Sequence, residues 1–218
     1  MSTPPIWVVR PEPGNNATMR RLAAQGLPAH SVPLFQGEPL PWTAPPSDNF
    51  DALMLTSANA LRHAGQDLAC YGQLPLWAVG ATTASAAHDA GLAVSRVGNG
   101  GVAELLEGAK GRILWLCGEA RTTPPAHAGL TVTPVPVYRM AETSVLPDRF
   151  GTKGIILLHS VRAARRIAGL VCDHRGTFTL VAISAEVANA AGDGWQCVRV
   201  ASSPTDAEMV AVTAQLCQ

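Results

Sequence analysis

Hydroxyl side chains occur at four places where an apolar, strand-like run gives way to a helix-like run. These are Thr56-Ser57, Thr82-Thr83, Ser160 and Ser184. In an open parallel sheet such transitions lie at the carboxyl ends of the strands, where ligands bind and where free helix N–H groups attract anions. Each hydroxyl alone is also an ordinary N-cap, worth about 1 kcal/mol. As a set, they indicate a site for a ligand with several negative charges.

Other polar residues follow strand-like runs and reach the same edge. Tyr138, one of two tyrosines, ends a strand, so its hydroxyl can face the ligand, although an amphipathic residue at a sheet edge has the same pattern. Arg10 and Arg139 also follow strand ends and can pair with carboxylates, or lie solvated on the surface. His159 stands before Ser160 and is either a proton donor or a hydrogen-bonded structural histidine.

The usual signatures of cofactor chemistry are missing from the sequence. There is no Walker phosphate loop, no Gly-x-Gly-x-x-Gly after the first strand, no Gly-x-Ser-x-Gly and no His-Glu-x-x-His. Five cysteines, odd in number and widely spaced, are typical of reduced thiols and offer no zinc-ligand spacing. We therefore expect a site without cofactor and without metal.

Strand-like and helix-like segments alternate along the chain. Residues 6–9, 29–35, 50–55, 76–79, 94–97, 113–117, 135–138, 154–158 and 180–183 are predicted strands, and 17–25, 58–63, 81–90 and 102–110 are predicted helices. Residues 36–49 contain four prolines and are expected to be a linker, neither a regular helix nor a central strand. This alternation predicts parallel, doubly wound sheets.

The chain contains an internal duplication. The run 76–87 has a counterpart at 180–191, and Gly26 and Gly129, like Ser57 and Ser160, are 103 residues apart. Four pieces therefore follow one another as X (6–35), Y (50–110), X′ (112–138) and Y′ (from 154 to the C-terminal helix after Pro204). Periodicity leaves two pairings open: two tandem domains, or a discontinuous domain that carries an inserted one. In both, two similar domains face each other across a cleft.

Composition narrows the class of protein. With 218 residues the chain can form one large domain or two of about 100 residues, and 16 basic residues balance 16 acidic ones, so we expect no nucleic-acid or acidic-membrane partner. The apolar runs are shorter than the roughly 18 residues of a membrane span. The N-terminal residues 1–9 do not resemble a signal peptide, which favours a cytoplasmic location.

In their order, several short motifs resemble the uroporphyrinogen-III synthase family. They are Leu55-Thr56-Ser57-Ala58-Asn59-Ala60, Ala78-Val79-Gly80-Ala81-Thr82-Thr83-Ala84, Gly129 to Tyr138 followed by Arg139, Ala182-Ile183-Ser184 and Ala201-Ser202-Ser203-Pro204-Thr205. Together they span nearly the whole chain. The resemblance implies an α/β fold with two similar parallel-sheet (flavodoxin/Rossmann-like) domains, one of them discontinuous, joined by a two-stranded linker. Domain 1 would be 1–35 plus 150–218, domain 2 would be 40–138, and 36–39 and 139–149 would be hinges.

The resemblance also implies a reaction. The family closes hydroxymethylbilane, a linear tetrapyrrole with eight carboxylates, to uroporphyrinogen III, with loss of water and inversion of the last pyrrole ring, usually through a proposed spiro intermediate. No cofactor is needed, because the pyrrole nitrogen expels the hydroxyl. By the family pattern Tyr138 assists that departure, and the substrate carboxylates bind Ser57, Asn59, Thr82, Ser160 and Ser184, with Arg10, Thr56 and Thr83 as further candidates. A cytoplasmic monomer that receives its substrate from the preceding pathway enzyme is expected.

One segment departs from the family pattern. Ala185-Glu186-Val187 stands where a Pro-Thr-Thr type of sequence often follows the strand, and the charge of Glu186 would repel a carboxylate. The main alternative function is a non-catalytic, two-lobed module that binds small anions. A second alternative is a different α/β lyase or isomerase that uses Tyr138 and His159.

Overall fold

The computed structural model describes residues 3–143 and 145–218. Three residues lie outside the described ranges: Met1, Ser2 and Ser144. Met1 and Ser2 belong to the N-terminal segment that does not resemble a signal peptide, and Ser144 belongs to the second predicted hinge. The chain divides into two compact units. Unit 1 contains the chain up to Gln36 and from Glu142 onward, and unit 2 contains Gly37–Ala141.

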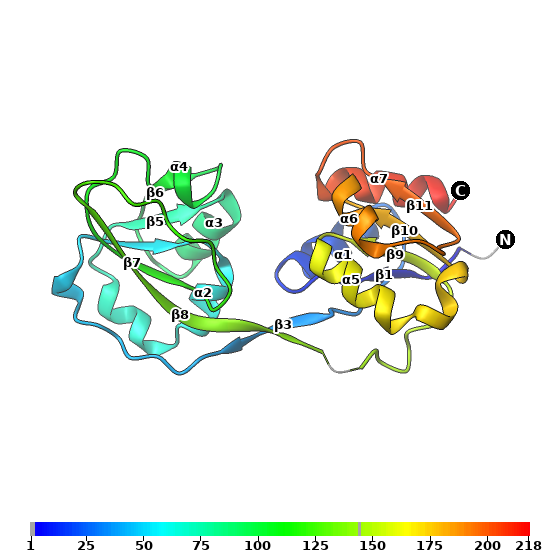
Figure 1. Ribbon diagram of the computed structural model, residues 1–218, viewed down its shortest axis with the longest axis horizontal. Helices are drawn as coiled ribbons and strands as arrows, with labels where there is room; N and C mark the ends of the chain where they lie inside the picture. The colour runs from blue at the N-terminus through cyan, green and yellow to red at the C-terminus, as the bar shows by residue number, and fades with distance from the viewer. Residues whose placement is uncertain (1–2, 144) are drawn as a thin grey trace. The chain divides into compact units, whose positions relative to one another are not determined.

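Unit 1 is a five-stranded parallel sheet covered by helices on both faces. Its elements are β1 (Ile6–Val8), α1 (Gly14–Ala24), β2 (Ala29–Ser31), β9 (Gly154–Leu158), α5 (Val161–Leu170), a 3-10 helix (Cys172–Thr177), β10 (Phe178–Ala182), α6 (Ala185–Ala191), β11 (Cys197–Val200) and α7 (Asp206–Leu216). The strand order is β11-β10-β9-β1-β2. In Figure 1 blue N-terminal elements and yellow to red C-terminal elements share this unit, so it is discontinuous in sequence.

Alternation along the strands builds the core of unit 1. Ile6 and Val8 of β1 pack with Ile155 and Leu157 of β9 in one cluster, which also takes in residues of α1 and α7. The residues between them point to the opposite face, as expected for a strand. They include Trp7, whose ring lies 4.7 Å from that of Phe150 between centroids, at a tilt of 40°. Both faces are apolar because helices cover both, as parallel sheets require.

Unit 2 is a six-stranded sheet with the order β3-β8-β7-β4-β5-β6. Its elements are β3 (Phe35–Pro39), a 3-10 helix (Ser47–Asn49), β4 (Ala52–Leu55), α2 (Ala58–His63), a 3-10 helix (Gln66–Tyr71), β5 (Leu76–Val79), α3 (Ala81–Asp89), β6 (Val94–Gly98), α4 (Val102–Leu105), β7 (Gly111–Gly118) and β8 (Leu130–Glu142). Strands β4 to β8 pair in parallel. The strands β3 and β8 carry the chain between the two units.

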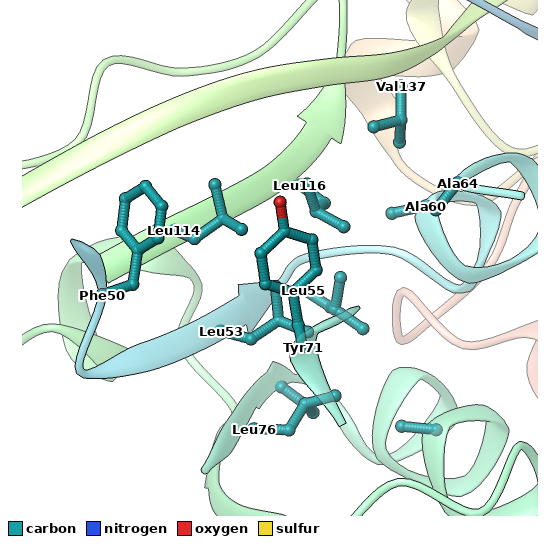
Figure 2. Packing of buried hydrophobic residues seen from close by; sticks show 12 residues of the cluster. Phe50, Leu53, Leu55, Ala60, Ala64, Tyr71, Leu76, Leu114, Leu116 and Val137 are labelled. Carbon is teal, nitrogen blue, oxygen red and sulfur yellow. The ribbon is translucent and has the colours of Figure 1, made fainter. Parts of the chain in front are cut away.

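The core of unit 2 supports the end of β8. Figure 2 shows Leu53 and Leu55 of β4 packed with Leu114 and Leu116 of β7, and places Val137 of β8 in the same cluster. Tyr71 closes this core, with its hydroxyl donating a hydrogen bond to the Pro45 carbonyl at 2.7 Å, and burial raises the pKa of this phenol to about 12. The other face of the sheet packs against α4.

The two sheets have the same topology. Read from one edge, β11-β10-β9-β1-β2 of unit 1 corresponds to β6-β5-β4-β7-β8 of unit 2, with β3 added at the edge of the latter. Each sheet therefore combines an X-type piece with a Y-type piece from the other half of the chain. The predicted fold class is confirmed: two similar parallel-sheet domains, one of them discontinuous.

The expected linker at 36–49 contains most of β3, which is an edge strand, so the prediction that this segment is neither a regular helix nor a central strand is confirmed. Two other local predictions were wrong in their bounds. The expected strand at 29–35 ends at Ser31, ahead of Pro33, which has no N–H to donate. The helix expected over 102–110 ends at Leu105, and Gly108, with φ at +66°, turns the chain soon afterwards.

Candidate functional site

Tyr138 lies near the end of β8, where a bulge redirects its side chain. The register places Pro136 opposite Cys117 and Tyr138 opposite Gly118, so Val137 is the extra residue. In a regular strand consecutive side chains point to opposite faces, but Val137 and Tyr138 both pack against the same cluster. The bulge therefore brings the tyrosine to the side of the sheet covered by α2.

The ring of Tyr138 lies against the backbone of Gly118 and beside the ring of His63. A Cβ atom added to Gly118 would lie 3.0 Å from Cζ and 3.1 Å from the hydroxyl oxygen of Tyr138. The His63 ring is stacked at 5.8 Å between centroids, with 28° between the planes. Within residues 3–143 and 145–218 the Tyr138 hydroxyl has no hydrogen-bond partner. It is therefore available to a ligand.

His63 is a half-buried histidine in the last turn of α2. Burial, followed by the nearby positive charge of Arg62, lowers its pKa below the ordinary value of 6.5. The imidazole beside Tyr138 is therefore neutral at pH 7.

Three candidates lie where β4 leads into α2. Ser57 caps the helix, its hydroxyl oxygen accepting from the Asn59 backbone N–H at 3.1 Å. Asn59 is 9% exposed, and its amide nitrogen contacts the Met140 sulfur at 3.7 Å. Thr56 accepts a hydrogen bond from the indole of Trp115 at 3.2 Å. The hydroxyl oxygens of Ser57 and Thr56 both accept in these contacts, so each hydroxyl keeps its own hydrogen to donate.

The transition from β5 to α3 is capped by a glycine. Gly80 adopts φ of +79°, and no side chain caps α3. Thr82 and Thr83 lie in the first turn instead, Thr82 exposed and Thr83 buried. The first-turn N–H groups of a helix lack intrahelical partners, and here no side-chain oxygen satisfies them. Such a terminus suits an anion.

In unit 1, Ser160 and Ser184 cap α5 and α6. Their hydroxyl oxygens accept from the backbone N–H groups of Ala163 at 3.2 Å and Val187 at 3.3 Å. Glu186 is exposed in the first turn of α6, where its negative charge interacts favourably with the helix dipole. The same charge opposes a carboxylate ligand at that terminus.

Asp206, the first residue of α7, is the centre of a hydrogen-bonded cluster in unit 1. Its carboxylate accepts from the Thr18 hydroxyl at 2.6 Å, from His159 Nε2 at 2.8 Å, from Arg21 at 2.7 Å and from Arg10 at 3.3 Å. The cluster thus joins the ends of β1 and β9 to α1 and α7. His159 is accordingly a hydrogen-bonded histidine with a 6% exposed side chain.

The charges in this cluster follow from burial and hydrogen bonding. Burial alone would raise the pKa of Asp206, but hydrogen bonds from His159 and Thr18 hold it well below the usual carboxyl value. Burial lowers the pKa of His159, and this effect exceeds that of the hydrogen bond to Asp206, which raises it. At pH 7 the carboxylate is ionised and the imidazole is neutral. With Arg10 and Arg21 the cluster carries one net positive charge.

Arg10 is packed against the N-terminus of α1. A Cβ atom on Gly14 would lie 2.4 Å from both Nε and one terminal nitrogen of its guanidinium group. The side chain is 28% exposed. Gly14 therefore provides the space in which Asp206 and Thr18 hold this guanidinium.

The structure brings the candidates together in two rows, one in each unit. Carboxyl ends of neighbouring parallel strands share one edge of a sheet. In unit 1 the row follows β1, β9 and β10 and contains Arg10, Ser160 and Ser184. In unit 2 it follows β8, β4 and β5 and contains Tyr138, Thr56, Ser57, Asn59, Thr82 and Thr83.

Sequence reasoning missed His63 and Asp206. Asp206 follows Pro204-Thr205, a recognisable helix start at which an acidic residue is ordinary, and its four donors come from distant segments. His63 carries no local signal beyond its place on a short helix.

Among the described residues, no group of three or more His, Cys, Asp or Glu side chains could hold a metal ion. No helix in the described part of the chain is long and apolar enough to cross a membrane.

Comparison with known proteins gives one family. The family model of uroporphyrinogen-III synthase HemD matches residues 16–211. A structure of a mutant uroporphyrinogen III synthase from the extremely thermophilic bacterium Thermus thermophilus is 18% identical, covers 97% of this chain and 98% of its own, and has a TM-score of 0.51. A second structure of the Thermus thermophilus enzyme is 17% identical, with 99% and 100% coverage and a TM-score of 0.43. No individual curated protein matches the sequence.

Proposed function

Because the chain belongs to the uroporphyrinogen-III synthase family, it is a cyclising lyase that makes uroporphyrinogen III from hydroxymethylbilane, and we propose that Tyr138 is its catalytic residue. The observation that carries this assignment is the free hydroxyl of Tyr138 at the carboxyl edge of the unit 2 sheet. The family match favours the synthase over the non-catalytic binding module and over a different lyase.

The reaction needs a proton at the departing oxygen. Hydroxide is a poor leaving group, and the lone pair of the terminal pyrrole nitrogen breaks the carbon–oxygen bond more easily when that oxygen leaves as water. A phenol within hydrogen-bond reach can donate the proton, an effect worth typically 10²–10⁴-fold. Since no protein group competes for the Tyr138 hydroxyl among the described residues, it is the donor that we assign.

Substrate carboxylates need several donors, which the two rows supply. We assign this role to the hydroxyls of Ser57, Thr82, Ser160 and Ser184, to the guanidinium group of Arg10, and to the segments of Thr56, Asn59 and Thr83. The Thr83 side chain is buried, so its backbone N–H is the donor that we propose there. At Asn59 the backbone N–H already donates to Ser57, so we propose the side-chain amide as the donor. The exposed, glycine-capped N-terminus of α3 is the strongest of these sites, because its N–H groups have no side-chain cap.

The proposal also covers the domain organisation, because the chain passes twice between the two units. We assign 1–35 with 150–218 and 40–138 to the two domains, and 36–39 and 139–149 to hinges that let the protein enclose its substrate. We further propose that the enzyme is a cytoplasmic monomer and receives hydroxymethylbilane from the preceding enzyme of the pathway. Size-exclusion chromatography with light scattering tests the monomer.

An isomer assay tests the function and the catalytic residue. Purified protein incubated with hydroxymethylbilane should give the type III isomer, whereas the spontaneous reaction gives type I. Tyr138→Phe should slow type III formation at least 100-fold. Tyr71→Phe is the matched control, since Tyr71 is the other tyrosine and its hydroxyl binds the Pro45 carbonyl inside the core. Type I product alone from the unmodified protein would overturn the assigned reaction, and full activity of Tyr138→Phe would overturn the role of that residue.

A further inference from the structure

We propose that His63 is a positioning residue for this reaction, whose ring fixes the orientation of the Tyr138 phenol. The inference rests on the proposed function of Tyr138. It concerns a residue outside both rows of substrate donors, because His63 lies at the last turn of α2 and not at its start.

The geometry places Tyr138 between two neighbours from different elements. On one side, the tip of its ring approaches Gly118 of β7 so closely that a Cβ atom there would lie 3.0 Å from Cζ. The His63 ring is stacked alongside, 5.8 Å away between centroids. Because the hydroxyl makes no hydrogen bond among the described residues, these ring contacts, and not a hydrogen bond, orient it.

His63 is itself fixed by a second glycine. A Cβ atom on Gly37 of β3 would lie 2.5 Å from His63 Nε2 and 3.2 Å from its Cδ2. The backbone of Gly37 therefore leaves the space that the imidazole tip occupies. From β3 to β7 the contacts run Gly37, His63, Tyr138, Gly118, so a change at Gly37 reaches the phenol through the histidine.

The chemistry of this arrangement favours a positioning role. At neutral pH the imidazole is uncharged, as its burial requires, and it offers a flat, stacked surface to the phenol. The position of a proton donor matters because a misplacement of about 1 Å can lower a rate by about 100-fold.

Substitutions at His63 and Gly37 separate positioning from folding. His63→Ala removes the ring and should lower kcat about 10-fold with little change in KM, as expected for the loss of an aromatic contact at the reacting group. His63→Phe restores a ring and should recover most of kcat. Gly37→Ala retains both His63 and Tyr138 but displaces the tip of the imidazole ring. It should therefore lower kcat, as His63→Ala does. His88→Ala, an exposed histidine in the last turn of α3, is the matched control and should have wild-type kcat.

Two further readouts exclude a merely structural effect. In a Tyr138→Phe background, His63→Ala should cause no additional loss of kcat, because the residue that it positions no longer donates a proton. Because the chain has two tyrosines, NMR of protein with isotope-labelled tyrosine rings should give one set of ring signals for each. His63→Ala should shift the signals of Tyr138 and leave those of Tyr71 unchanged.

The outcomes distinguish this inference from the proposed function. Wild-type kcat in His63→Ala, while Tyr138→Phe is impaired, overturns the positioning role and leaves the catalytic role intact. Failure of His63→Phe to recover kcat also overturns it, since a ring nitrogen and not the stacked ring would then be needed. Full activity of Tyr138→Phe overturns the proposed function itself.

Discussion

Replacing Asp206 with Asn should lower the free energy of unfolding of unit 1 more than a substitution on its surface does. The substitution keeps the shape of the side chain and removes the charge that Arg10, Arg21, Thr18 and His159 approach. Asp206 is 13% exposed and His159 6%, so part of the cluster is shielded from water, whereas Arg21 is 51% exposed and its contribution is weakened by solvent. Breaking a buried pair costs about 3–5 kcal/mol, and with this screening we expect a loss of about 2–4 kcal/mol.

The sign of the pH dependence follows from the carboxyl pKa. The folded-state pKa of Asp206 lies below that of the unfolded chain, so its stabilising contribution is fully present above the unfolded value, near 3.9, and is lost as pH falls through the folded value. The difference in unfolding free energy between wild type and Asp206→Asn should therefore be fully present at pH 7 and shrink only in strong acid.

Urea unfolding at pH 7, followed by tryptophan fluorescence and circular dichroism, measures the change. Asp173→Asn is the control, since Asp173 is an exposed aspartate of unit 1 outside the cluster. It should leave the unfolding midpoint unchanged. A wild-type midpoint in Asp206→Asn would refute the reasoning, because it would mean that four donors around a shielded carboxylate add no net stability.

Three other outcomes are expected. Gly14→Ala places a Cβ atom 2.4 Å from the Arg10 guanidinium and should raise KM for hydroxymethylbilane several-fold in steady-state assays with kcat little changed; an unchanged KM would remove Arg10 from the substrate site. Gly80→Ala should lower the free energy of unfolding by about 1–2 kcal/mol because of its φ of +79°, whereas Gly169→Ala, in an open position on α5, should be neutral or stabilising in the same urea titration. Iodoacetamide at pH 8 should modify the exposed Cys70 and Cys172 in the folded protein. It should modify Cys117 only after urea unfolds the protein, because burial raises the pKa of that thiol to about 11. Peptide mass spectrometry gives the order of modification.

The repeat and the alternation of elements were enough to predict the fold class, because both depend on short-range pattern. The 103-residue offset gave the two similar halves, and apolar runs such as 154–158 gave buried parallel strands. The pairing of X with Y′ followed from the family resemblance and not from periodicity, since β1 pairs with β9 across almost 150 residues and no local signal records that choice.

The candidate site was predictable only where a residue acts through its own helix. Ser57, Ser160 and Ser184 stand at the starts of helices, as their spacing predicts. The break after β5 was predicted to have hydroxyls, but Gly80 is the cap, since a residue with positive φ is needed there. The partners of Arg10 and Tyr138 were not predictable, because Asp206 and His63 reach them through tertiary packing.

Capping a helix and binding a carboxylate are not competing roles for these serines. In each of the three caps the hydroxyl oxygen accepts from a backbone N–H, which uses a lone pair and leaves the O–H hydrogen to donate. Capping also fixes the side-chain rotamer, so that this remaining hydrogen is presented from a defined position. α3 reaches the same end differently, with a glycine cap that leaves its N–H groups uncovered. The two kinds of helix start therefore differ in which hydrogens face an anion. They are a side-chain O–H in one case, and in the other mainly backbone N–H groups with the Thr82 hydroxyl beside them. A Ser→Ala change should therefore weaken binding at the first kind more than loss of the Thr82 hydroxyl weakens it at the second.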